Sequence, residues 1–504
     1  MQHQGCLREV ITLLQQAIHA YRTQHPEEDF PLLHHTEGTL LLRFQALFYA
    51  PLFGIGKLTE FDVKEHPLLT LQGRSYQSST LSQFLGQLER IDAAQALLPA
   101  LVPVHAGEIG YVDGHMIAFW TRGSMHKGKI TMRGRIMAGS QAVIAHNERG
   151  HALGLAYHAP DIRLPHVIVD YCAQVAEATG ITLFVMDREV NSVQMACDFE
   201  HQGLGLLSML DANEYEGLAS FDARAIGTLE DGSEVYAGQW HLPRPGDPRC
   251  FVIVVDRERV LVFWGTSVVK DTLDLLEWPR VYRARNETQE KSFKRMIEHG
   301  ALNVNYGIKK IIGPDRHQMR ARVAIEQALV VSYEKVEKKV REVKAQHEKV
   351  AESQEKGHTK RLAQRARRLG EKAEELKKAQ EKQETLGEKA RALGEPTTRA
   401  DRDFRKQKVM TLRTLLLENA LRAFVTALWG KLSEKVSLES ILGMLFARSG
   451  SRIERGSEII YWINTEGLSA AYQRMQAQVV EGINAMELRC GEKAIRIRLR
   501  EAPS

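Results

Sequence analysis

The segment from residue 105 to 210 changes its hydrophobic period several times, and this alternation constrains the fold more than any other feature of the chain. Its three opening stretches are strand-like and are separated by turns containing glycine: 108–120, 129–146 and 149–159. The four stretches that follow are alternately helix-like and strand-like: 164–179, 181–187, 189–203 and 204–210. A period near two predicts strands and a period near 3.6 predicts helices. The chain is therefore expected to contain an α/β domain.

Three strands, a helix, a strand, a helix and a strand form the element order of an RNase H-like fold. We therefore predict an RNase H-like core whose first part spans 105–210. A β-rich insertion is expected at 211–268, and the core resumes at 269–329 with a helix. Helical apolar spacing predicts an N-terminal helical domain over 1–104. The C-terminal region, 399–504, is predicted to be helical and to end in a hairpin.

Residues 330–398 form a highly charged segment with the pattern of a helical arm. Apolar residues recur there with the spacing of a coiled coil, and the phase slips near Gly357, which predicts two helices that double back as a hairpin. Residues 334–395 hold 18 basic and 13 acidic residues, a net charge of +5 that equals the net charge of the whole chain. This excess fits either a solvated helix face or an arm that contacts DNA or a protein partner.

Two aspartates are expected to meet at the centre of the predicted sheet. Asp113 lies in the first strand, and Asp187 ends the strand that follows the first helix. These strands are neighbours in an RNase H-like sheet. Two carboxylates in one half-buried place repel each other, and an isolated buried charge is costly. A divalent cation such as Mg²⁺ removes both costs, and a pair of ions can assist phosphoryl transfer. The pair therefore predicts a metal site.

A third carboxylate is expected from the helical pattern of residues 282–296. Glu290 is the preferred candidate and Glu287 is the alternative, because residues three apart share a helix face. Arg285 and Lys294 lie on either side of Glu290, as expected where phosphates pass close by.

Several other functional classes find no support in the sequence. The chain has no GxxxxGK[ST] phosphate loop and no HExxH zinc motif, and its five cysteines include no CxxC pair. No apolar run approaches the roughly 18 residues that cross a bilayer, so no membrane association is expected. The wide spacing of the cysteines favours a reducing, intracellular setting. The N-terminus lacks the layout of a signal peptide.

Three short strings together resemble the DDE transposases of bacterial insertion sequences, in the branch with a strand-rich insertion between the second Asp and the Glu. The strings are YVDG at 111–114, MDRE at 186–189 and YRARNETQEKSFKRM at 282–296. That family carries a helix signature Tyr-x2-Arg-x3-Glu-x6-Lys. Tyr282 and Arg285 match its first half, but its Glu position then falls on Gln289. Residue 297, where Glu290 would require the lysine, is Ile297, and Lys294 lies one turn earlier.

The resemblance covers residues 105–315 and implies a cut-and-paste transposase. Asp113, Asp187 and Glu290 would be both the catalytic and the metal-binding residues, with two Mg²⁺ ions that Mn²⁺ can replace. The partners would be the terminal inverted repeats of the element and target DNA, bound by a homodimer in the nucleoid-associated part of a bacterial cytoplasm. DNA contacts are expected from five residues: Arg188, Trp264, Tyr282, Arg285 and Lys294. The N-terminal domain either binds DNA or only packs. Two alternatives remain, a nuclease without strand transfer and a non-catalytic DNA-binding protein derived from a transposase.

Overall fold

The structure is a computed structural model that describes most of the chain: residues 2–63, 75–102, 106–121, 124–130, 133–241, 245–257, 259–298, 302–307, 309–356, 359–446 and 448–500. It divides into two compact units. The first, called the body, comprises Met1–Trp120, Gly128–Ile308 and Asp403–Ser504. The second, called the arm unit, comprises Thr121–Lys127 and Lys309–Arg402.

The N-terminal part of the body is helical. Its α-helices are α1 (Gln2–Gln24), α2 (Glu37–Tyr49), α4 (Ser78–Arg90) and α5 (Ala93–Leu97). On α4 the apolar stripe Leu81, Phe84, Leu85 and Leu88 is buried, as its helical spacing predicts. These side chains share one hydrophobic core with α13 (Arg405–Trp429), which is buried along most of its length.

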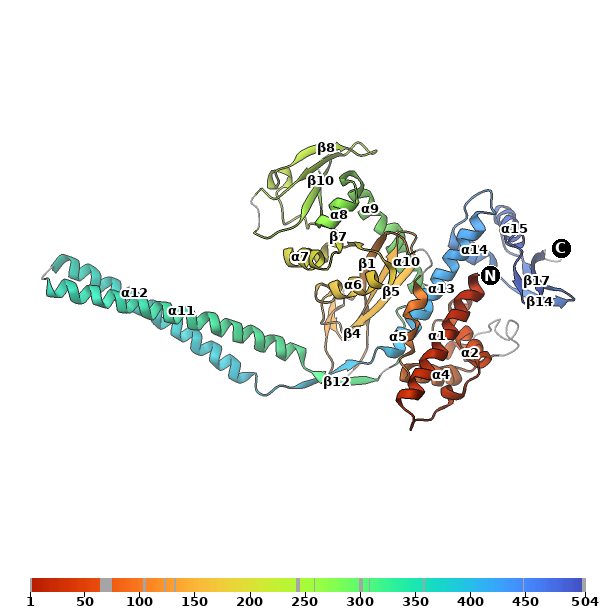
Figure 1. Ribbon diagram of the computed structural model, residues 1–504, viewed down its shortest axis with the longest axis horizontal. Coiled ribbons are helices and arrows are strands. Elements are labelled where there is room, and N and C mark those ends of the chain that lie inside the picture. Colours follow the sequence, from red (N-terminus) through yellow and green to blue (C-terminus); the bar gives the residue numbers. More distant parts are fainter. Residues whose placement is uncertain are drawn as a thin grey trace. The chain divides into compact units, whose positions relative to one another are not determined.

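A nine-stranded mixed sheet forms the centre of the body (Figure 1). Its strand order is β5-β4-β1-β6-β7-β11-β10-β9-β8. The first five of these strands span β5 Ala152–His158, β4 Gly139–Asn147, β1 Ile109–Ala118, β6 Leu183–Met186 and β7 Gly205–Met209. Strand β1 pairs antiparallel with β4 and parallel with β6, and β6 pairs parallel with β7. A short hairpin, β2 (Gly128–Ile130) and β3 (Arg135–Met137), lies between β1 and β4 in the sequence. The coarse prediction of a mixed α/β fold is confirmed.

Alternate residues of β6 point to opposite faces of the sheet, because side chains alternate along a strand. Phe184 and Met186 pack with α6 (Ile168–Thr179) and α7 (Val193–His201). Leu183 and Val185 pack on the other face, with α9 (Trp278–Arg285). The side chain of Asp187 would follow Val185 to the α9 face by this alternation.

The predicted insertion adds strands to the central sheet and does not form a sheet of its own. Its strands are β8 (Arg224–Thr228), β9 (Glu234–Gly238), β10 (Cys250–Asp256) and β11 (Arg259–Gly265). Strand β11 pairs antiparallel with β7, and β10, β9 and β8 follow in order.

The C-terminal region differs from the helical prediction. After α13 and α14 (Leu438–Leu445) comes a four-stranded sheet in the order β14-β15-β17-β16, with α15 (Ala470–Asn484) between β15 and β17. The strands span Gly450–Arg455, Glu458–Asn464, Lys493–Arg500 and Arg489–Cys490 in that order. A tight turn at Gly456, whose φ is +52°, joins β14 to β15. The predicted closing hairpin corresponds to β16 and β17. The helical prediction was wrong because β15 pairs in parallel with a strand that lies beyond a whole helix.

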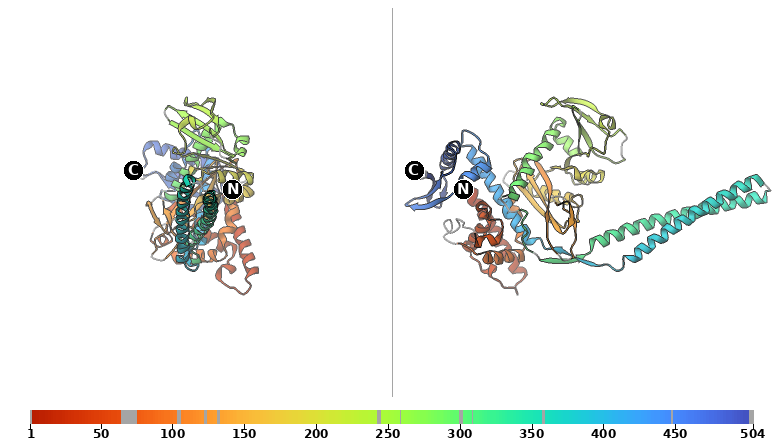
Figure 2. Two further views of the ribbon diagram at one scale, coloured as in Figure 1. Left: turned by 90° about the vertical axis from the view of Figure 1, so that its left-hand side faces the viewer. Right: turned by 180° about the vertical axis from the view of Figure 1, so that it is seen from behind.

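The arm unit is a long helical hairpin on a two-stranded base. Helix α11 runs from Arg316 to Glu355 and α12 from Thr359 to Ala392, and both views show them side by side (Figures 1 and 2). Ion pairs join them, including Lys339 to Glu375 at 2.5 Å and Lys372 to Glu342 at 2.8 Å. The predicted turn residue, Gly357, lies outside the described residues.

The arm begins earlier than the sequence predicted. Strand β12 (Lys310–Pro314) pairs antiparallel with β13 (Thr398–Arg402), and Asp315 caps α11 by accepting from the backbone of His317 at 3.0 Å. Residues 309–329, which were expected to continue the core, therefore belong to the arm unit. Across the described part of the chain, no helix combines the length and the hydropathy that crossing a membrane requires.

Candidate metal and catalytic site

Asp113 and Asp187 occupy matching positions on two neighbouring parallel strands. Val112 pairs in register with Met186, and each aspartate is the next residue. Tyr111, two residues before Asp113, and Val185, two before Asp187, both belong to the core on the α9 face. The alternation of side chains therefore directs both carboxylates to that face.

A π-helical turn brings Glu290 to the same place. Helix α9 ends at Arg285, the π segment spans Asn286–Glu290, and α10 continues over Lys291–Glu298. A π turn adds one residue to a helix, so residues five apart share a face there instead of four apart. Glu290 therefore takes the position relative to Arg285 that residue 289 would take in a regular α-helix. The extra residue of the π turn thus offsets the one-residue difference between Gln289 and Glu290 in the sequence.

The residue that the signature selects, Gln289, lies inside the core. Its side chain is fully buried, and its Nε2 donates to the carbonyl oxygens of Tyr111 at 3.2 Å and Ile144 at 3.4 Å. These contacts tie the π segment to β1 and β4. The Glu287 carboxylate is exposed and pairs with Lys291, away from the two aspartates.

The guanidinium of Arg285 lies between the three acids. Its Nη1 is 3.7 Å from Asp113 Oδ2, and its Nη2 is 3.7 Å from Asp187 Oδ1 and 3.4 Å from Glu290 Oε1. The side chain of Arg285 is only 9% exposed, whereas the exposed fraction rises from 26% for Asp113 to 54% for Glu290. The cluster is thus closed on the Asp113 side and open on the Glu290 side.

The charge balance of the cluster favours further cations. Burial raises the pKa of Asp113 to about 7, against the opposing effects of Arg285 and of the Gly114 N–H. Burial and the neighbouring Asp187 also raise the pKa of Glu189. Four carboxyl groups, those of Asp113, Asp187, Glu189 and Glu290, thus lie around one guanidinium, that of Arg285. All available ligand atoms are carboxylate oxygens, which suit Mg²⁺ and Mn²⁺.

In this arrangement the three acids do not offer one ligand atom each to a single ion. Asp113, Asp187 and Glu290 are not among the described groups that bring one ligand atom each within 4.8 Å of one another. Metal ions in two-ion sites lie about 3.5–4 Å apart and share only part of their ligands.

Asp187 is held by two residues that were expected to contact DNA, Tyr282 and Arg188. Tyr282, expected to touch DNA, is buried, and its hydroxyl donates to Asp187 Oδ1 at 3.2 Å. Burial and the nearby Asp187 raise the pKa of Tyr282, so the phenol keeps its proton. The backbone N–H of Arg188 also donates to Asp187, at 2.8 Å. The Arg188 side chain is half exposed and lies 3.3 Å from Asp211.

A groove of about 350 Å³ runs past the open side of the cluster. Asp113, Glu290 and the exposed Lys294 line it. His115 also lines it, stacks on Phe293 at a centroid distance of 5.6 Å and lies 2.6 Å from Asn303 Oδ1. The structure thus brings together the three predicted acids, Arg285 and Lys294.

One of the predicted DNA contacts, Trp264, lies in the core instead, as does Arg295, the basic residue next to Lys294. Trp264 is fully buried in β11, and the geometry favours packing over stacking on a base. Arg295 of α10 is buried, and its Nε donates to Glu418 of α13 at 2.7 Å. Arg295 also contacts Glu439 at 2.8 Å, so the helix after Glu290 is anchored by ion pairs.

Comparison with known proteins gives a distant structural similarity. No family model matches the sequence, and no curated protein matches it. A solved structure that it resembles is the cryo-EM structure of a piggyBac transposase synaptic complex with hairpin DNA. The two chains are 10% identical with a TM-score of 0.36, and the alignment covers 59% of this chain and 68% of that chain. Because this similarity is too weak to carry a functional argument, that argument rests on the residues.

Proposed function

We propose that this chain is a DDE transposase with an RNase H-like core, in which Asp113, Asp187 and Glu290 hold two Mg²⁺ ions that Mn²⁺ can replace. The π segment Asn286–Glu290 carries the proposal, because it brings the third acid to the face of the sheet where both aspartates point. The strand order β5-β4-β1-β6-β7, with β1 parallel to β6, supports the RNase H-like assignment.

The protein residues would act mainly by positioning. Bound divalent ions would supply the neutralisation of charge that phosphoryl transfer to water or to a DNA 3′ hydroxyl requires. Tyr282 and the Arg188 N–H orient Asp187, while Arg285 offsets part of the charge of the acids. Lys294 faces the groove beside Glu290, where it can attract a phosphate of the DNA backbone. The substrates would be the ends of the element and a target DNA, held by a homodimer in a bacterial cytoplasm.

Cleavage of DNA that carries the flanking ends of the protein's own gene tests the proposal. We expect Mg²⁺-dependent cleavage by the wild type and its loss in Asp187→Ala and Glu290→Gln. The loss should exceed the roughly 10- to 100-fold that removal of an outer-shell partner costs. Glu287→Gln is the matched control, because Glu287 is exposed and points away from the cluster. Cleavage that survives Asp187→Ala, or equal losses in the two glutamate variants, would refute the site.

The products separate the remaining functions. Joining of a cut end to a second DNA indicates a transposase, and cutting without joining indicates a nuclease. Specific binding without cleavage in either Mg²⁺ or Mn²⁺ indicates a non-catalytic DNA-binding protein.

A further inference from the structure

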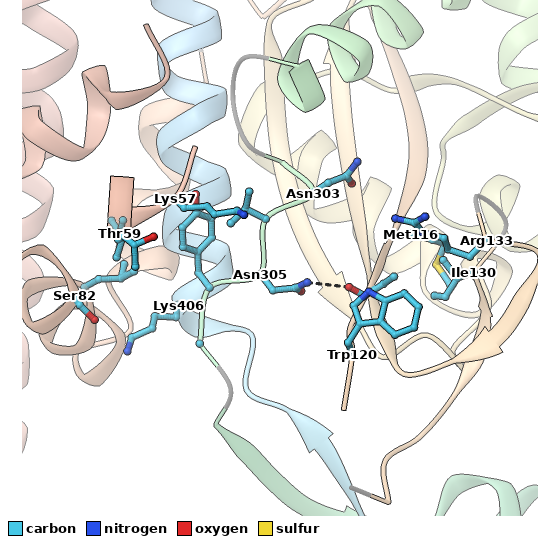
Figure 3. A pocket seen from close by; sticks show the side chains of 16 residues that line it. Lys57, Thr59, Ser82, Met116, Trp120, Ile130, Arg133, Asn303, Asn305 and Lys406 are labelled. Atoms are coloured by element: carbon cyan, nitrogen blue, oxygen red, sulfur yellow. Dashed lines mark hydrogen bonds between the residues drawn. The ribbon is translucent and has the colours of Figure 1, made fainter. Parts of the chain in front are cut away.

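A second pocket, of about 690 Å³, lies in the body beyond the acid cluster along β1 (Figure 3). We call it the Trp120 pocket. Figure 3 shows Trp120 and Arg133 on one side, Lys57 and Lys406 on the other, and Asn305 between them. Its volume lies within the range of about 300–1,000 Å³ that small-molecule sites occupy.

Hydrogen bonds fix the wall of this pocket that is formed by residues 303–307. Asn305 Nδ2 donates to the carbonyl oxygen of Ala118 at 2.9 Å, which ties this wall to β1. The backbone N–H of Tyr306 donates to Gln407 Oε1 at 2.9 Å, and Gln407 Nε2 donates to the carbonyl oxygen of Val304 at 3.1 Å. The Tyr306 hydroxyl donates to the carbonyl oxygen of Gly56. The wall is therefore held from β1, from α13 and from the N-terminal helical part.

The charge of the lining suits an anion. Lys57, Arg133 and Lys406 line the pocket, and no acidic residue is among its lining residues. Lys406 shares its charge with Glu89, whose Oε2 is 3.6 Å from its Nζ. For Lys57 and Arg133, the structure shows no ion pair with any residue that it describes.

Trp120 adds a flat aromatic surface to this basic lining. Its indole is 69% exposed, although large apolar side chains that face water lose the stability that burial would give. Proteins that bind unpaired strands stack a base on an aromatic side chain and neutralise the phosphates with lysine or arginine. The lining of this pocket holds both kinds of side chain.

The pocket adjoins the groove of the acid cluster. Asn303 lines the pocket, and its Oδ1 is 2.6 Å from Nε2 of His115, which lines the groove. The groove and the pocket therefore meet at Asn303 and His115.

We propose that the Trp120 pocket binds one nucleotide unit of an unpaired DNA strand, with the base stacked on Trp120 and its phosphate near Lys57 and Lys406. The choice of DNA as the polymer rests on the proposed function, whereas the base and phosphate chemistry rests on the pocket alone.

Fluorescence anisotropy with a labelled single-stranded oligonucleotide, measured without divalent metal, tests this binding. Trp120→Ala should raise the Kd about 5- to 100-fold, as loss of one stacked base does, and Trp120→Phe should raise it less. Lys57→Ala should lower the slope of log K against log salt by about 0.7, whereas the exposed Lys431→Ala should leave it unchanged. Tyr472→Ala, which removes an exposed aromatic ring of the body (48%) that does not line the pocket, is the matched control.

An unchanged Kd in a folded Trp120→Ala variant would overturn the proposal, as would an equal loss in Tyr472→Ala. Free deoxyadenosine monophosphate is then added at the same concentration at which the oligonucleotide saturates the protein. Displacement of the oligonucleotide would assign the pocket to a free nucleotide and overturn the strand assignment. Because this assay needs no cleavage, a failure of the proposed function leaves its readout intact.

Discussion

Replacing Gln289 by glutamate distinguishes the two registers of the helix. If residue 289 were the catalytic position, Gln289→Glu would supply the family's acid and would be tolerated. The structure predicts the opposite, because residue 289 is fully buried and its Nε2 donates to two carbonyl oxygens, those of Tyr111 and Ile144. A carboxylate there would face both oxygens as an acceptor, so the carboxyl group is expected to stay protonated in the folded chain.

The cost follows from linkage. Holding a glutamate neutral at pH 7 costs about 1.36 kcal/mol for each pH unit above an unfolded pKa near 4.3, or about 3.7 kcal/mol. A protonated carboxyl group can donate to only one of the two carbonyls, and the lost hydrogen bond adds about 1 kcal/mol. The folded-state pKa is raised, so this cost is absent below the unfolded pKa and grows as the pH rises.

Urea unfolding of Gln289→Glu and wild type at pH 5 and pH 7 measures this cost. The difference in unfolding free energy between the two proteins should grow by about 2.7 kcal/mol over these two pH units. Gln289→Met, a control of similar size, should lose the two hydrogen bonds without any dependence on this titration. A Gln289→Glu protein as stable as wild type at pH 7 would refute the π register.

Three further perturbations test other parts of the structure. Burial lowers the pKa of His146 to about 3, so the fold should lose stability as the pH falls below the unfolded pKa of about 6.5. In urea unfolding, the unfolding free energy of wild type should fall by about 2 kcal/mol more than that of His146→Leu between pH 7 and pH 5. Arg285→Met should lower the melting temperature, because the acids lose the guanidinium between them. Millimolar Mg²⁺ should raise the melting temperature of this variant more than that of wild type. In a third variant, an Asn-Gly turn between the paired strands β12 and β13 replaces residues 316–396. The melting temperature of the body should stay unchanged, and DNA affinity, measured by anisotropy, or self-association, measured by sedimentation, should fall. No change in either would remove the proposed role of the arm.

The placement of the two aspartates could be predicted from the sequence because it depends on local patterns. The strand 181–187 is apolar until Asp187, and Asp113 interrupts another strand. Once the element order makes these strands neighbours, strand alternation directs both carboxylates to one face.

The position of Glu290 could be selected but not explained from the sequence. A π turn is a non-local outcome here, since Gln289 reaches carbonyls of β1 and β4 that lie far away in the chain. The same holds for Arg295, which looks like a solvated or phosphate-binding residue in a charged helix. Its partner, Glu418, lies 123 residues further along.

Trp264 shows a different limit of sequence reasoning. The side chains of Val262 and Trp264 lie on the same face of β11, and both are fully buried. Phe263 is buried on the opposite face, so both faces of β11 are covered. Residues 260–264 are all apolar, and the sequence alone does not show that two layers cover the strand.

The ion pairs between α10 and α13 have a consequence for genetic screens. Arg295 lies one helical turn beyond Glu290, and its partner Glu418 is a buried acid in a different part of the sequence. Loss of Glu418 would leave Arg295 without its main counter-ion and disturb the backbone that presents Glu290. A screen for inactive variants would therefore recover Glu418 together with the three acids of the cluster, and its phenotype could be mistaken for that of a fourth metal ligand. Raising the Mn²⁺ concentration would not restore such a variant, whereas lowering the assay temperature would.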